Sequence, residues 1–171
     1  MAEAEIRERL PKIWASLLLR GITPILIGTA MLFLPSEPAS FYALLFGAYV
    51  FIDGILLLAQ TFIMGIADSK RWSRTLHGMI GVLVGLAMFF IPEISHMRLV
   101  TLFSGYEITT GLLQVLTAFD LRKMSDNNDL VAIGGIISIV VGGLLSIRPM
   151  DTLSDLVRAI GIFLMVRGSI L

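Results

Sequence analysis

The amino-acid sequence repeats itself three times with a period of 57 residues. A shift by this period superposes glycines and prolines at equivalent places in successive units. The superposed sets are Gly21, Gly78 and Gly135; Gly28, Gly85 and Gly142; Pro35, Pro92 and Pro149; Gly54, Gly111 and Gly168; and Gly47 with Ser104 and Gly161. A fixed period dictates the architecture, because each unit must fold in the same way. Positions that repeat indicate scaffold, and positions that break the repeat are candidates for function.

The composition places the chain in a membrane. Hydrophobic residues make up 56% of it and charged residues 15%, whereas soluble proteins have about 25% charged residues. The formal net charge is zero, so the chain offers no basic surface for nucleic acid. It has no cysteine and only 2 histidines, which excludes thiolate chemistry and makes a metal site unconvincing. We predict no metal, no cofactor and no nucleic-acid partner.

Six apolar stretches are candidates for membrane spans, each of which needs about 20 residues. They cover residues 13–34, 39–63, 74–91, 97–119, 130–147 and 152–171. The repeated prolines end every first helix of a unit, because proline cannot continue a helix. Each unit is therefore predicted to be a helical hairpin.

The resulting fold class is all-α, an integral membrane bundle of six transmembrane helices built from three repeated helical hairpins. We expect a short cytoplasmic N-terminal segment, 1–12, and a single domain, 13–171. The repeat units cover about 14–70, 71–127 and 128–171. Such an arrangement is open to pseudo-threefold symmetry.

The distribution of lysine and arginine predicts the orientation, because cytoplasmic loops are rich in both. The hairpin turns carry only Arg98 and Arg148. The N-terminal segment and the longer loops between hairpins carry Arg7, Arg9, Lys12, Lys70, Arg71, Arg74, Arg122 and Lys123. Both termini are therefore predicted to be cytoplasmic. The N-terminal segment mixes acids with bases, which is not typical of a signal peptide.

The repeated glycines predict helix packing. Lipid gives no hydrophobic drive between helices, so association depends on small residues that let backbones approach. Ligand binding is the alternative interpretation of these glycines. The predicted packing residues are Gly21, Gly28, Gly47, Gly54, Gly78, Gly85, Gly111, Gly135, Gly142, Gly161 and Gly168.

A unit of the form G-x6-G-x6-P, a short turn and G-x6-G, present three times, resembles the HdeD-like acid-resistance membrane proteins. The resemblance covers residues 14–171. It implies a multi-pass protein of the bacterial cytoplasmic (inner) membrane that is linked to acid stress, and it implies no catalytic motif. The third unit departs from the pattern because it stops early, with Leu171 aligned to Leu57.

Ionisable side chains inside the spans break the repeat. Such groups are costly in a membrane and are therefore functional candidates. They are Glu107, Arg158, Asp53, Arg20 and His77.

Glu107 is the strongest of these candidates. It shares a helix face with Ser104 and Gly111, which points it into the bundle. There it must be protonated or paired, because burial disfavours the charged form. Arg158 lies on the equivalent face of the last span but nearer the extracytoplasmic side, and a long arginine side chain could close part of that gap. A structural salt bridge and a proton-sensing or transport role both remain open.

Arg20, Asp53 and His77 fall at a similar depth near the cytoplasmic side. Arg20 and Asp53 belong to one hairpin and could pair. His77 could make the group responsive to cytoplasmic acidification, because histidine titrates near neutral pH. An interfacial pair with snorkelling side chains is the alternative. Arg167 is predicted to have no special role, because a cation near a helix C-terminus interacts favourably with the helix dipole.

No known catalytic motif occurs in the chain, so we predict that it is not an enzyme and has no catalytic residue. The leading hypothesis is a protein that supports acid or envelope stress tolerance through protonation of intramembrane carboxylates. One alternative is a small transporter or proton/ion pathway, for which Pro24 offers a break in the first span. The other is a structural module that assembles with other membrane proteins or as a homo-oligomer. The lipid bilayer is the expected partner in every case.

Overall fold

A computed structural model describes residues 2–34, 37–63, 72–91, 94–122 and 129–170 of the chain. This part contains only helices: α1 (Ala2–Phe33), α2 (Ala39–Ile63), α3 (Trp72–Phe90), α4 (His96–Arg122), α5 (Asp129–Ile147) and α6 (Leu153–Ile170). The predicted all-α class with six helices is confirmed. The longer loops expected between the hairpins lie largely within residues 64–71 and 123–128, outside the described part of the chain.

Four of these helices are long and apolar enough to cross a membrane. The qualifying stretches are Ala39–Phe62, Trp72–Phe90, His96–Phe119 and Leu130–Ile147. The apolar part of α1 is shorter, Leu18–Phe33, and α6 contains Asp155, Arg158 and Arg167. Large apolar side chains are exposed on the outer surface of every helix, as expected where lipid is the solvent. The chain is a helical membrane protein.

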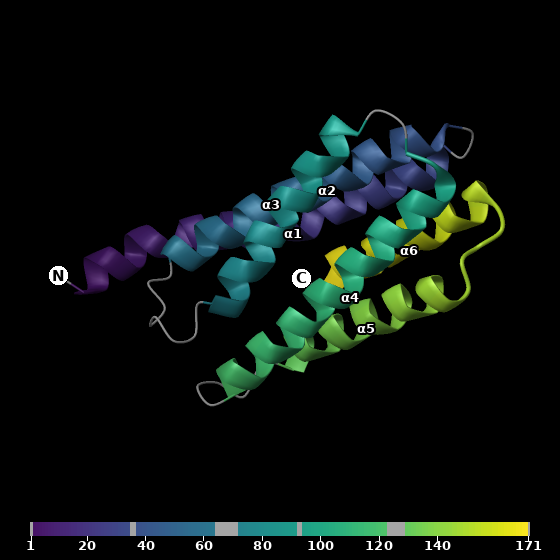
Figure 1. Ribbon diagram of the computed structural model, residues 1–171. Coiled ribbons are helices and arrows are strands. Elements are labelled where there is room, and N and C mark those ends of the chain that lie inside the picture. Colours follow the sequence, from purple (N-terminus) through teal and green to yellow (C-terminus); the bar gives the residue numbers. More distant parts are fainter. Residues whose placement is uncertain (1, 35–36, 64–71, 92–93, 123–128, 171) are drawn as a thin grey trace.

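Successive helices run in opposite directions (Figure 1). Helices α2 and α4 end towards the N-terminal end of the bundle. Helices α2, α4 and α6 begin at the other end, here called the connection end. Helix α1 begins at Ala2, so residues 2–12 continue the first helix. It also stays helical through Pro24, so the first span is not unwound there.

Local side-chain hydrogen bonds fix two helix starts at the connection end. Ser95 precedes α4, and its Oγ accepts a hydrogen bond from the Arg98 amide at 3.4 Å. Thr152 precedes α6, and its Oγ1 accepts from the Asp155 amide at 3.2 Å while donating to Asp155 Oδ2 at 2.6 Å. These caps satisfy amide groups that the first turn of a helix leaves without partners.

The closest helix packing joins neighbouring units. The main pairs are α2 with α3, α4 with α5, and α6 with α1, whereas the two helices of one hairpin contact each other less. A Cβ atom added to Gly54, Gly111 or Gly168 would lie 2.7, 2.7 or 2.5 Å from the carbonyl oxygen of Gly78, Gly135 or Gly21, respectively. Each of the packing glycines predicted from the sequence lies in one of these three interfaces. Because α6 returns to α1, the three equivalent interfaces close a ring.

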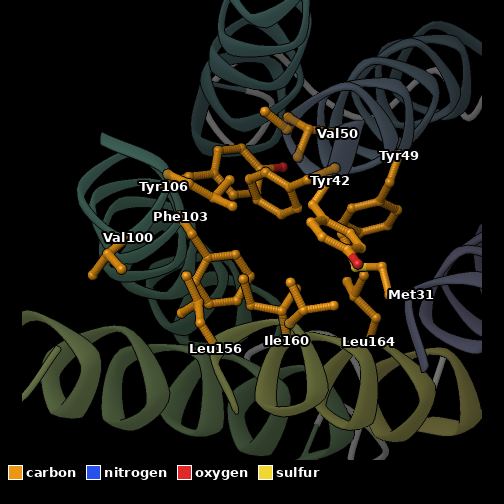
Figure 2. Packing of buried hydrophobic residues seen from close by; sticks show 14 of the residues in the cluster. Met31, Tyr42, Tyr49, Val50, Val100, Phe103, Tyr106, Leu156, Ile160 and Leu164 are labelled. Atoms are coloured by element: carbon orange, nitrogen blue, oxygen red, sulfur yellow. The ribbon is translucent and has the colours of Figure 1, made fainter. Parts of the chain in front are cut away.

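The second helix of each unit supplies most of the core. The buried apolar side chains form sets that lie 57 residues apart in the sequence. These sets are Tyr42, Leu99 and Leu156; Phe46, Phe103 and Ile160; Tyr49, Tyr106 and Phe163; and, from the first helices, Met31, Met88 and Leu145. Figure 2 shows the side chains of α2, α4 and α6 converging on one centre. Helices α2, α4 and α6 are therefore the inner ring, and α1, α3 and α5 the outer ring.

Aromatic rings fill the space between the inner helices. The Phe46 and Phe103 ring centroids are 4.9 Å apart, and Phe103 meets Phe163 edge-on at 5.8 Å. Edge-to-face and tilted pairs of this kind stabilise a core beyond the area that they bury. The large rings also keep the backbones of α2, α4 and α6 apart. Close backbone contact between helices is therefore confined to the glycine interfaces.

Candidate functional site

Two buried ion pairs lie between this core and the N-terminal end of the bundle. In the first pair, Arg20 on α1 donates from Nε to Asp53 Oδ1 at 2.7 Å and from Nη2 to Oδ2 at 3.3 Å. Its Nη1 also donates to Gln60 Oε1 at 3.4 Å. Arg20 and Asp53 are 8% and 2% exposed. The pairing expected within the first hairpin is present, and a planar guanidinium holding both carboxylate oxygens fixes its geometry.

The second ion pair joins two inner helices. Arg167 Nη1 on α6 donates to Glu107 Oε2 on α4 at 2.7 Å, and it lies 3.4 Å from Ser138 Oγ on α5. Glu107 is fully buried and Arg167 is 7% exposed. Breaking such a pair is strongly unfavourable, because it leaves one charge buried without a partner.

Arg158, the candidate partner of Glu107 on the last span, does not pair with it, and its predicted place on the inward face was wrong. The Arg158 side chain is 61% exposed and lies 3.9 Å from Asp155 on the same helix. Arg158 and Arg167 are nine residues apart, and nine residues turn a helix by about two and a half turns. The two arginines therefore lie on opposite faces of α6, and only Arg167 faces the interior.

The expectation that Arg167 has no special role was also wrong. Its place near the end of α6 suggested a simple helix-terminus contact. The repeat carried the better signal, because Arg167 is equivalent to Asp53 and Thr110. Asp53 faces the interior, so its equivalents face the interior too.

His77 is buried near these pairs and is 4% exposed. Its Nε2 has no hydrogen-bond partner among the described residues. The same holds for the hydroxyl oxygens of Tyr49 and Tyr106 and for Glu107 Oε1. Buried polar atoms are usually satisfied, so this cluster has unused capacity to bind.

A cavity of about 430 Å³ opens beside the ion pairs. All six helices contribute to its wall. The polar wall residues are Arg20, Gln60, Arg74, His77, Gln114, Thr117, Ser138 and Arg167, and the others are Leu57, Leu130, Val131, Gly134, Ile137, Phe163, Val166 and Ile170. The structure thus brings Arg20 and His77 to one site with Arg167. Sequence reasoning missed Gln60, Gln114, Thr117 and Ser138, since uncharged polar residues are weak signals.

The residues that line this cavity are better suited to binding a ligand than to making or breaking covalent bonds. It presents guanidinium, imidazole, amide and hydroxyl groups, and Asp53 and Glu107 lie behind the arginines that pair with them. Among the described residues, no group of three or more His, Cys, Asp or Glu side chains could hold a metal ion.

A sequence profile described as "Short repeat of unknown function (DUF308)" matches residues 19–90 and 76–146. Together the two matches cover most of the chain, which therefore belongs to this family of repeat proteins. They begin at residues 19 and 76, which is the 57-residue spacing of the glycines. No curated protein and no solved structure matches the chain.

Proposed function

We propose that the chain is a non-enzymatic, multi-pass protein of the bacterial inner membrane, of the HdeD-like type, that supports tolerance of acid or envelope stress. The observation that carries this proposal is the buried Glu107–Arg167 pair between two inner helices. A membrane-embedded ion pair is costly to bury, so its presence points to a role beyond packing.

Glu107 is the carboxylate at which proton uptake would change the bundle most directly. Its Oε1 has no partner in the described part of the chain, whereas both oxygens of Asp53 accept hydrogen bonds from Arg20. A proton can therefore join Glu107 without displacing a hydrogen bond. The neutral carboxyl would leave Arg167 charged and buried without a counter-charge, which is unfavourable. Acidification would thereby weaken the contact between α4 and α6 and alter helix packing or a partner interaction.

Acid survival tests this proposal in a strain that depends on this protein. Glu107→Gln removes the titratable group and keeps the side-chain shape, so survival after an acid challenge should fall. Asp155→Asn is the matched control, because Asp155 is an exposed carboxylate at the far end of α6. Unchanged survival with Glu107→Gln, at normal protein levels, would contradict the proposed role.

A small transporter or proton/ion pathway is the second candidate, and the polar cavity favours it. The cavity lies against both ion pairs and draws on all six helices. Purified protein in proteoliposomes under a pH gradient should then carry a flux that Glu107→Gln reduces. Flux no greater than that of empty vesicles counts against this candidate.

We also propose that both termini are cytoplasmic, as the lysine and arginine distribution favours. The chain has no cysteine, so single cysteines can report the orientation. In intact spheroplasts an impermeant maleimide should label Arg98→Cys, at the connection end of α4, but not Trp72→Cys, at the start of α3. Labelling in the reverse pattern would invert the proposed topology.

A further inference from the structure

We propose that the cavity beside Arg167 binds an organic anion with a carboxylate or phosphate head and an apolar body. This inference goes beyond the function proposed above and does not depend on it. The cavity volume of about 430 Å³ falls in the range of about 300–1,000 Å³ typical of small-molecule sites.

The cavity lies where the third unit lacks a side chain. Gly134 on α5 is equivalent in the repeat to Arg20 on α1 and His77 on α3. A Cβ added to Gly134 would meet only Gln114 Oε1, at 3.5 Å, whereas one added to Gly135 would lie 2.8 Å from the Gly111 carbonyl oxygen. Gly134 therefore faces open space although the next residue is tightly packed. The space is a specific difference between otherwise similar units.

The polar side of the wall is rich in hydrogen-bond donors. Arg167 uses Nη1 for Glu107 and Ser138, and its side chain also lines the cavity. His77, buried on the same wall, has an unused Nε2. No described carboxylate lines the cavity. Two of the guanidinium groups in the wall pair with Asp53 and Glu107 behind it. With no described carboxylate on the cavity side, they favour a charged oxygen acceptor there, because charge-assisted hydrogen bonds are the strong ones.

The other side of the wall is apolar and reaches the outer surface. Phe163 and Ile137 line it from α6 and α5. Leu130 and Val166 also line it and are 59% and 45% exposed. Helices α5 and α6 pack against each other less than the helices of the other two hairpins. An amphipathic anion can therefore place its head at Arg167 and its body between α5 and α6.

Two sources could supply such a ligand, a free organic acid or an anionic lipid. Octanoate is the probe for the first source, with neutral octanamide as its matched control. Titration calorimetry on the full chain in phosphatidylcholine nanodiscs should show saturable octanoate binding, with octanamide at least about tenfold weaker. For the second source, native mass spectrometry of protein from mixed nanodiscs should show retained phosphatidylglycerol in preference to phosphatidylcholine.

Two glycine variants on α5 separate the cavity from the rest of the helix. Gly134→Leu fills the open space. For each probe that binds the unaltered protein, this variant should weaken the affinity by about tenfold or more. Gly143→Leu is the control, because no atom lies within 4 Å of a Cβ at Gly143 and it does not line the cavity. Should Gly134→Leu fail to fold, the double variant Glu107→Gln with Arg167→Gln removes both charges and should abolish the preference for octanoate over octanamide.

The outcomes distinguish the sources and can overturn the proposal. Binding of octanoate alone assigns a free organic acid, and retention of phosphatidylglycerol alone assigns a lipid. Both results support the site only when Gly134→Leu weakens binding by about tenfold or more and Gly143→Leu does not. If the two glycine variants bind both probes equally, or if neither probe binds the unaltered protein, the proposal is wrong.

Discussion

Arg167 on α6 donates a 2.7 Å hydrogen bond to Glu107 on α4, across 60 residues of sequence and between two helices of the inner ring. Each member of the pair is nearly or fully buried. The contact is therefore a tertiary link that holds the third unit against the second.

Removing the charge of Arg167 should destabilise the protein strongly. Arg167→Gln leaves Glu107 buried without its partner, and the free energy of unfolding should fall by about 3–5 kcal/mol. Arg158→Gln is the control, because the exposed Arg158 should matter by no more than about 0.5 kcal/mol. Denaturant unfolding in detergent measures both values.

A double variant separates the ion pair from the general effect of the substitution. Adding Glu107→Gln to Arg167→Gln removes the uncompensated charge, so it should restore part of the lost stability. If the stability lost by the double variant equals the sum of the losses of the two single variants, the side chains do not interact.

Close backbone approach should make Gly111 intolerant of a methyl group. In Gly111→Ala the Cβ would lie 2.7 Å from the Gly135 carbonyl oxygen, so α4 and α5 must separate, at about 1–3 kcal/mol. A Cβ added to Gly105 on the same helix would have no atom within 4 Å. Gly105→Ala should therefore stabilise the protein by about 0.4–1 kcal/mol. Thermal unfolding of the two variants compares them directly, and equal shifts would argue against the packed interface.

The hydroxyl groups of Tyr49 and Tyr106 should be dispensable for folding. Both hydroxyl oxygens are buried without a partner among the described residues, and the third equivalent position is Phe163. Tyr49→Phe and Tyr106→Phe each remove an unsatisfied polar atom, so stability should hold or rise by about 1 kcal/mol. A loss of stability in melting experiments would show instead that these hydroxyls make stabilising contacts.

Ring closure should be visible by photo-crosslinking. A Cβ on Gly168 would lie 2.6 Å from Ile25 Cγ1, so a diazirine side chain at position 25 should crosslink α1 to α6. The same side chain at the neighbouring Leu26, which is 64% exposed, should label lipid. Mass spectrometry of the crosslinked peptides reads both outcomes, and a protein crosslink from position 26 only would contradict the ring.

The sequence predicted the helices, the period and the contribution of glycine to packing, because each depends on local composition and spacing. It also indicated the Arg20–Asp53 pair, because the two residues share one hairpin. It did not predict the partner of Glu107. Arg158 and Arg167 are similar in sequence distance from Glu107, and the choice between them depends on which face of α6 turns inward.

The cavity was likewise beyond sequence reasoning. Gly134 and Gly135 are both glycines and adjacent in the sequence, although only Gly135 meets a neighbouring backbone. Adjacent positions on a helix point about 100° apart, so one of them can be packed while the other lines an open space. The difference in packing between Gly134 and Gly135 depends on the position of α4, which the sequence does not show.

The sequence by itself determined how many units the protein has, which residues form helices and which positions are small enough for close packing. The tertiary structure alone decided which helices are neighbours. Glycine faces are alike in all three units, and lipid favours no particular partner through hydrophobic burial. Which helices become neighbours therefore depends on the direction in which each glycine face points around the bundle. That direction is a non-local property. That choice closes α6 onto α1, places Arg167 beside Glu107 and leaves the space at Gly134.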